Sequence, residues 1–228
     1  MFTEVEPRQD MNAVQEENER GSQNSGGHSP KTAARHRALR EALLDAAERR
    51  IAATGLVELK ARDLAQEAGC ALGALYNVFE DLDALILGVN MRTFDALEAA
   101  LDAAGEAGGD PVARIEALAD AYLTYAAANR RRWATLFEHR MAGDRPTPDW
   151  YRARLAHLFA HVEAPLGALC PVLDEAARAC LARSLFSAVQ GVVALGLDEK
   201  VGPMPEPTLR AHLRLLARAM AQGLKPGG

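Results

Sequence analysis

The chain has 228 residues, of which 49% are hydrophobic and 25% are charged, as is typical of a globular protein of one or two domains. A formal net charge of −5 excludes a surface coated in Lys and Arg, and no unbroken apolar run reaches the roughly 18–20 residues that cross a bilayer. The N-terminus is too polar for a signal peptide, and three cysteines without a paired framework fit a reduced compartment. We therefore expect a cytoplasmic protein.

The charge is distributed unevenly along the chain. Residues 1–30 carry six acids and two bases and almost no apolar periodicity, which predicts a disordered acidic and polar tail. Residues 31–62 carry eight bases and four acids. A local basic face on an acidic protein can be the footprint of a nucleic-acid partner, although a solvated helix face gives the same pattern.

After Ser29-Pro30, which has the composition of a helix start, apolar residues recur at helical spacing almost to the C-terminus. Gly55 ends the first predicted helix, and no alternating strand pattern of useful length is found. The sequence predicts an all-α protein of about nine helices, with a helix-turn-helix domain over 31–80 and a helical bundle for ligand binding and dimerisation over 81–228. After the first, the helices are expected at 62–68, 72–79, 81–104, 110–128, 130–141, 148–168, 173–195 and 206–222.

Residues 61–80, ARDLAQEAGCALGALYNVFE, have the spacing of a helix-turn-helix. Ala65 provides the small residue where two helices cross, and Gly69 provides a turn residue that tolerates positive φ. Leu75 follows as the inward apolar anchor of the second helix. This motif lies between an amphipathic helix and a long helix, and it predicts a pair of helices that binds DNA.

Over residues 35–88 the chain resembles the N-terminal domain of TetR/AcrR-family transcriptional regulators. The matching residues are Leu43-Leu44-Asp45-Ala46-Ala47, Gly55, Arg62-Asp63-Leu64-Ala65, Ala68-Gly69, Gly73, Leu75-Tyr76, Phe79, Asp83 and Leu85. The later segment with Trp133 and the run 185–191 resembles one C-terminal subtype of that family more loosely. The resemblance implies a homodimer that places one helix of each subunit in the major groove of a palindromic operator, with half-sites about 34–36 Å apart.

The predicted recognition helix departs from the family pattern, because Ala71, Leu72 and Ala74 stand where the family commonly has polar residues. Our hypothesis is that Asn77 contacts a base edge while the three apolar residues pack on thymine methyl groups, although simple helix filling explains Leu72 and Ala74 as well. Phosphate contacts are assigned to the remaining members of the set, Tyr76, Arg37, Arg40, Lys60 and Arg62.

The C-terminal part holds most of the aromatic residues, and the resemblance implies a small-molecule effector pocket there. Candidates for effector binding are Phe94, Tyr122, Trp133, Phe137, Phe159, Phe186 and Gln190, although each aromatic could equally be solid core. The last two helices are the expected dimer face, unless they form only an intramolecular hairpin. The dimerisation candidates are Ala179, Ala182, Phe186, Val189, Val193, Leu209, Leu213 and Leu216.

Other chemistry has little support in the sequence. His157 and His161 share one helix face but have no third metal ligand nearby, so neither a metal nor a cofactor is expected. A redox pair of Cys170 and Cys180 is conceivable, but two buried small side chains are the simpler interpretation. Glu138-His139-Arg140 lacks a nucleophile or a second carboxylate, so we expect no enzyme.

The sequence therefore predicts a dimeric, ligand-responsive regulator, most simply a repressor, whose partners are double-stranded DNA and a small-molecule effector. The alternative is a helical ligand-binding or scaffolding protein whose helix-turn-helix no longer binds DNA. Operator binding distinguishes the two.

Overall fold

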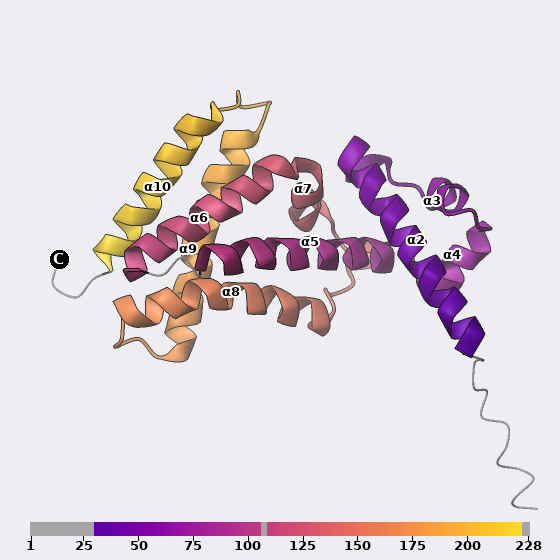
Figure 1. Cartoon of the computed structure of the whole chain (residues 1–228), viewed down its shortest axis with the longest axis horizontal. Coiled ribbons are helices and arrows are strands. Elements are labelled where there is room, and N and C mark those ends of the chain that lie inside the picture. The colour runs from indigo at the N-terminus through magenta and orange to yellow at the C-terminus, as the bar shows by residue number, and fades with distance from the viewer. Residues whose placement is uncertain (1–29, 106–108, 225–228) are drawn as a thin grey trace, which may run out of the picture. The chain divides into compact units, whose positions relative to one another are not determined.

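The computed structural model describes residues 30–105 and 109–224, and within them it contains nine α-helices, two short 3-10 helices and no strand. The predicted all-α fold is confirmed, whereas the predicted tail and the Ser29 cap lie outside the described residues. The helices are α2 (Pro30–Thr54), η1 (Leu56–Glu58), α3 (Ala61–Glu67), α4 (Leu72–Val78), α5 (Leu82–Gly105), α6 (Pro111–Ala128), α7 (Arg130–Glu138), η2 (Ala142–Asp144), α8 (Asp149–Leu169), α9 (Glu175–Leu197) and α10 (Glu206–Gly223) (Figure 1).

The chain divides into two compact units, residues 1–39 and residues 40–228, which we describe separately. The described part of the first unit is residues 30–39, the beginning of α2, where the side chains are mostly exposed. The second unit holds the remainder of α2 and all later helices.

The helix-turn-helix consists of α3 and α4, joined by a turn at Gly69. Gly69 has φ +67°, a left-handed conformation that costs glycine little, and this is the role predicted for it. Ala65 and Leu75, the predicted crossing residue and inward anchor, are both buried. Because α4 is only seven residues long, packing of its underside against buried neighbours must hold it in place.

Ion pairs fasten α3 to the second half of α2. Glu67 accepts hydrogen bonds from Arg49 Nε and Nη2 at 3.0 and 2.9 Å and from Arg50 Nε at 3.0 Å. The hydrogen bond from Arg49, with a smaller contribution from Arg50, holds the pKa of Glu67 below its usual value despite some burial. These two arginines therefore contribute to the fold of the domain.

The bundle is built around α6, which contacts α5, α7, α8, α9 and α10. Figure 1 shows α5 lying between α6 and α8. Pro111 begins α6 after Asp110, whose side chain accepts a hydrogen bond from Val112 N and caps the helix. The helix α7 ends at Glu138, three residues before the predicted boundary, so residues 139–148 form a connecting segment to α8 that includes η2.

Candidate nucleic-acid interface and ligand cavity

The recognition-helix candidate α4 presents an exposed face. Tyr76 is 48% exposed and Leu72 37% exposed, and Ala71 and Asn77 are also exposed. Leu75, on the opposite side of the helix, has no exposed surface. One face of α4 is thus anchored in the domain while the face proposed for base contacts remains accessible.

The predicted phosphate-binding cations differ in their exposure and in their contacts. Lys60 and Arg62, at the start of α3, are exposed. Arg40 is half-buried, with its guanidinium 5.0 Å from the centre of the Phe79 ring, so a cation–π contact already orients it. Arg37 is exposed within the first unit. Arg49 and Arg50 belong to the same basic stretch but were not assigned to phosphates, and in the fold both pair with Glu67 of α3.

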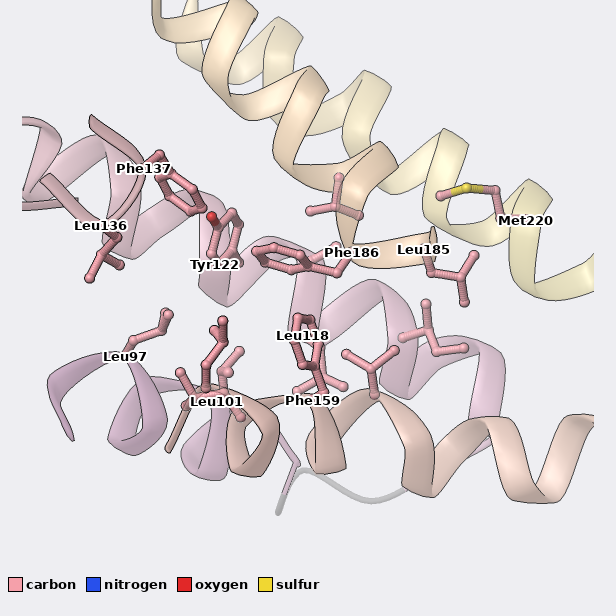
Figure 2. Close-up of a pocket in the computed structure, with 16 residues that line it drawn as sticks. Leu97, Leu101, Leu118, Tyr122, Leu136, Phe137, Phe159, Leu185, Phe186 and Met220 are labelled. Atoms are coloured by element: carbon pink, nitrogen blue, oxygen red, sulfur yellow. The ribbon is translucent and has the colours of Figure 1, made fainter. Parts of the chain in front are cut away.

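An apolar cavity of about 80 Å³ lies inside the bundle (Figure 2). Its walls come from α5, α6, α7, α8, α9 and α10, and the Tyr122 hydroxyl is the one oxygen among the side chains drawn in Figure 2. An apolar cavity of this kind favours uncharged, apolar guests, since a buried charge without a partner is costly. The lining residues are Leu97, Leu101, Ile115, Leu118, Ala119, Tyr122, Leu136, Phe137, Leu155, Leu158, Phe159, Val162, Leu185, Phe186, Val189 and Met220.

The Tyr122 hydroxyl is held by two neighbours. Trp133 Nε1 donates a hydrogen bond to it at 2.8 Å, and the hydroxyl donates to Gln190 Oε1. Burial raises the pKa of Tyr122 well above its usual value, so the hydroxyl keeps its proton throughout the physiological range. This chain of hydrogen bonds joins α6, α7 and α9 at the wall of the cavity.

The seven effector candidates do not all line the cavity. Tyr122, Phe137, Phe159 and Phe186 do, and Phe159 and Phe186 meet edge to face with ring centres 5.3 Å apart. Trp133 and Gln190 instead line a neighbouring, more polar cleft formed by α6, α7 and α9. Phe94 lies outside both linings and packs against Tyr151 of α8, so the structure places it in the core.

The helix α7 is bonded to α2 as well as lining the cavity. Arg131 Nη1 donates hydrogen bonds to the carbonyl oxygens of Ala52 and Ala53, near the end of α2. Arg132 Nη1 lies 2.7 Å from Glu48 Oε1 on the same helix. A cation at the C-terminal end of a helix is favourable because unpaired carbonyls gather there.

A second connection joins the segment after α7 to the beginning of α5. Asp83 accepts hydrogen bonds from Ala142 N at 2.8 Å and Arg145 Nη2 at 2.7 Å, and its Oδ1 lies 3.0 Å from His139 Nε2. Burial raises the pKa of Asp83, but these hydrogen bonds outweigh it and lower the pKa below the usual value. The cavity-lining α7 and the start of α5, four residues after α4 ends, are therefore held together.

The dimerisation candidates divide by burial. Ala182, Val193, Leu209 and Leu213 are buried in the core of the chain itself, so the set cannot face a second copy as a whole. Phe186 and Val189 line the cavity, and Ala179 is half-buried. Leu216 is 43% exposed, and other exposed residues on α9 and α10 include Cys180, Ala188, Leu195, Ala211 and Leu215. The helical spacing of apolar residues does not show which face of α9 or α10 packs against the core of the same chain.

The residues considered for other chemistry have ordinary surroundings. His157 Nε2 lies 3.0 Å from Glu98 and His161 Nδ1 lies 3.7 Å from Asp102, both on α5. Among residues 30–105 and 109–224, no group of three or more His, Cys, Asp or Glu could hold a metal ion. Cys170 is buried but Cys180 is exposed, contrary to the expectation that both are buried.

One helix in the described part of the chain, α9, is long and apolar enough to cross a membrane by length and composition. Only 28% of its most apolar window is buried. Arg178 and Arg183 interrupt the apolar sequence of this continuous helix, so the helix contains no unbroken apolar run long enough to cross a bilayer. The core helix of a bundle passes the same test, so this is weak evidence for a membrane.

Comparison with protein families gives a match over the bundle. Residues 115–220 match the family model described as "Tetracyclin repressor-like, C-terminal domain". A comparison with curated proteins gives no match. The matched segment runs from α6 into α10 and includes most of the cavity wall.

Solved structures show the same fold over most of the chain. A Rhodococcus sp. RHA1 protein of unknown function is 24% identical, with a TM-score of 0.63 over 89% of this chain and 98% of its own. A putative TetR-family transcription regulator from Shewanella sp. PV-4 is 20% identical, with a TM-score of 0.60 over 81% and 96%. RolR, solved in complex with the ligand resorcinol, is 18% identical, with a TM-score of 0.58 over 83% and 95%.

Proposed function

Since the chain belongs to the TetR family of transcriptional regulators, we propose that it is a ligand-responsive repressor that binds a palindromic operator as a homodimer. A small-molecule effector in the apolar cavity releases it from DNA. The observation that carries this proposal is the placement of α7, which lines the cavity on one side and bonds to α2 on the other.

In the DNA complex, α4 lies in the major groove and the exposed cations hold the phosphates. Asn77 reads a base edge, and Ala71, Leu72 and Ala74 contact thymine methyl groups. Lys60 and Arg62 supply phosphate contacts, because they are exposed at the start of α3. Arg37 and Arg40 on α2 and Tyr76 on α4 complete the set. The division into a DNA-binding domain over 31–80 and a bundle over 81–228 belongs to this proposal.

Salt dependence of operator binding tests these contacts. Each phosphate contact contributes about −0.9 to the slope of log K against log salt concentration. Each substitution removes one phosphate contact from each subunit of the dimer, so we expect Lys60→Ala and Arg62→Ala each to reduce the slope by about 2 and to weaken binding to all sequences alike. Lys200→Ala removes an equal charge from an exposed position after α9 and serves as the control. Slopes that are unchanged in the α3 variants would remove both residues from the interface.

The dimer forms through the exposed stripes of α9 and α10. Leu195, Leu215 and Leu216 are 60%, 64% and 43% exposed, and small residues at Ala188 and Ala211 permit close approach of the helices. Two copies related by a twofold axis would bury both stripes in a four-helix bundle. The same burial accounts for the apolar surface of α9 without a membrane.

Effector binding acts on DNA through α7 and the segment that follows it. A guest larger than the cavity must displace wall residues such as Phe137, and a shift of α7 strains its bonds to α2 and the contacts at Asp83. The result is a reorientation of α5 and of the two recognition helices relative to each other. Coupling of this kind typically amounts to about 1–3 kcal/mol, or roughly 5- to 150-fold in operator affinity.

The alternative, a ligand-binding or scaffolding protein without DNA binding, is favoured by one observation, the scarcity of polar side chains on the exposed face of α4. Gel retardation with fragments of the region upstream of this gene separates the two functions. Retardation that persists against excess non-specific competitor supports the repressor. No retardation of any fragment at low salt supports the alternative.

A further inference from the structure

The apolar cavity is too small to be the whole effector site. Its volume is about 80 Å³, whereas an apolar protein cavity that binds benzene has a volume of roughly 150 Å³. A regulator's effector therefore needs additional space, which must come from a neighbouring cleft that the wall residues can open.

Such a cleft lies next to the cavity. We call it the polar chamber; it is formed by α5, α7, α8 and the segment between α7 and α8. Leu136 and Leu155 line both the cavity and the polar chamber, so these two side chains separate them. Figure 2 shows Leu136 at one edge of the residues that surround the cavity. Rotation of these leucines would join the two spaces.

The polar chamber contains a buried acceptor without a partner. Asn90 is 1% exposed, and its Oδ1 has no hydrogen-bond partner among the described residues. Its Nδ2 donates to the Tyr151 hydroxyl at 3.2 Å, and Tyr151 lines the same chamber. A buried carbonyl left unpaired loses the hydrogen bond that it would make to water, so buried polar groups nearly always have a partner, from the protein or from a bound molecule.

The two groups are complementary to a hydroxyl. Asn90 Oδ1 can accept the hydroxyl hydrogen of a ligand, and the Tyr151 O–H can donate to the ligand's oxygen. Burial raises the pKa of Tyr151 to about 12, so that proton remains in place at neutral pH. The chamber is also lined by Arg140, Arg145 and Arg152. Asp81 and Asp83 are already paired with Arg145, and Asp149 is paired with Arg152, so Asp144 is the one lining acid left to balance a cationic ammonium, which disfavours such a group as the donor.

We propose that the effector is an uncharged apolar molecule with an alcohol or phenol hydroxyl. Its apolar body occupies the cavity, and its hydroxyl passes between Leu136 and Leu155 to bind Asn90 and Tyr151. This inference rests on the proposed function in taking the cavity as the effector site, and it adds the chemical class of the ligand and the residues that recognise it.

The test is a calorimetric titration of the full chain with 4-alkylphenols, from ethyl to pentyl, and with the matched alkylbenzenes, which lack only the hydroxyl. We expect at least one phenol to bind roughly tenfold or more tightly than its hydrocarbon partner, because the hydroxyl satisfies a buried acceptor. In Asn90→Leu the preference should fall to about twofold or less while the hydrocarbon still binds. Tyr151→Phe should reduce the preference in the same direction.

The control is Tyr125→Phe, which removes a buried hydroxyl from a residue that lines neither the cavity nor the polar chamber, and it should leave the preference unchanged. A preference that survives in Asn90→Leu, or that is lost in Tyr125→Phe, would overturn the proposal, as would the absence of binding by every probe. Thermal unfolding of each variant confirms that it is folded. Gel retardation, measured separately, tests the proposed repressor function apart from the proposed ligand class. Failure to bind DNA overturns the repressor function. DNA binding without a phenol preference overturns only the ligand class.

Discussion

The imidazole of His139 lies 3.0 Å from the carboxylate of Asp83, and both side chains are largely buried. Asp83 stands in the first turn of α5, where a carboxylate is also favoured by the helix dipole. The contact joins the segment after the cavity-lining α7 to the helix that follows α4. In the proposed mechanism, this contact is one of the points through which a movement of α7 is transmitted to the helix-turn-helix.

We predict that Asp83→Asn lowers the free energy of unfolding by roughly 1–3 kcal/mol at neutral pH, because it removes a hydrogen-bonded charge from a buried site. The pKa of Asp83 is lowered in the folded chain, so its contribution is present above the unfolded pKa of about 3.9 and is lost as the pH falls through the folded value. Urea unfolding of both proteins from pH 7 to pH 3 measures the difference. A stability gap that does not narrow below pH 4 would contradict this assignment.

The close approach of α9 and α10 gives a second prediction. A Cβ added at Gly196 would overlap Leu209 Cδ1 and lie 2.8 Å from Leu209 Cδ2, and Leu209 is fully buried, so it has little room to move. Gly196→Ala should therefore reduce the free energy of unfolding by about 1–3 kcal/mol. Gly191→Ala, on the same helix with open space around it, should be neutral or stabilising by up to about 1 kcal/mol. Equal effects in thermal unfolding would show that helix propensity, and not packing, governs both positions.

The proposed dimer face predicts a change in mass. A charge introduced by Leu216→Asp would be buried without a partner in the four-helix bundle, so the dimer should dissociate at micromolar concentration. Val57→Asp introduces the same charge at an apolar residue that is 95% exposed in η1, and it should leave the dimer intact. Sedimentation velocity measures both variants. A wild-type chain that sediments as a monomer would rule out the dimer.

The reading of bases predicts a change in sequence preference. Asn77→Ala should lower the affinity for the cognate site by roughly 1–3 kcal/mol and relax the preference at one base pair of each half-site. Its affinity for unrelated DNA should stay the same, since phosphate contacts are kept. Footprinting on operators with single base changes detects this. An unchanged site preference would exclude Asn77 from base contacts.

Much of this fold could be read from the sequence, because helical periodicity and helix-ending residues are local signals. Gly69 and Leu75 took the predicted positions, since a tight turn and a buried anchor depend on few neighbours. The cavity was harder to predict: Phe94 packs on Tyr151, whereas aliphatic residues such as Leu136 form much of the wall. A given face of a helix can line the cavity, pack in the core of the same chain or contact a second copy. The three-dimensional arrangement of the helices decides which of these it does.

The role of Asn90 illustrates the same limit. A single asparagine within an apolar helix has no periodic signature, and its importance comes from the unpaired acceptor that burial creates. Likewise, the acids that engage Arg49 and Arg50 lie 13 to 18 residues away, so composition could not distinguish structural from exposed cations.

Operator binding in the presence and absence of effector tests the central claim most directly. Purified protein should protect a palindrome upstream of its own gene or of a divergent neighbour, and a 4-alkylphenol that binds the chain should release it, with a loss of affinity of roughly 5- to 150-fold. Protection that persists unchanged when the cavity is saturated would contradict the coupling through α7. The absence of any protected site would contradict the repressor itself.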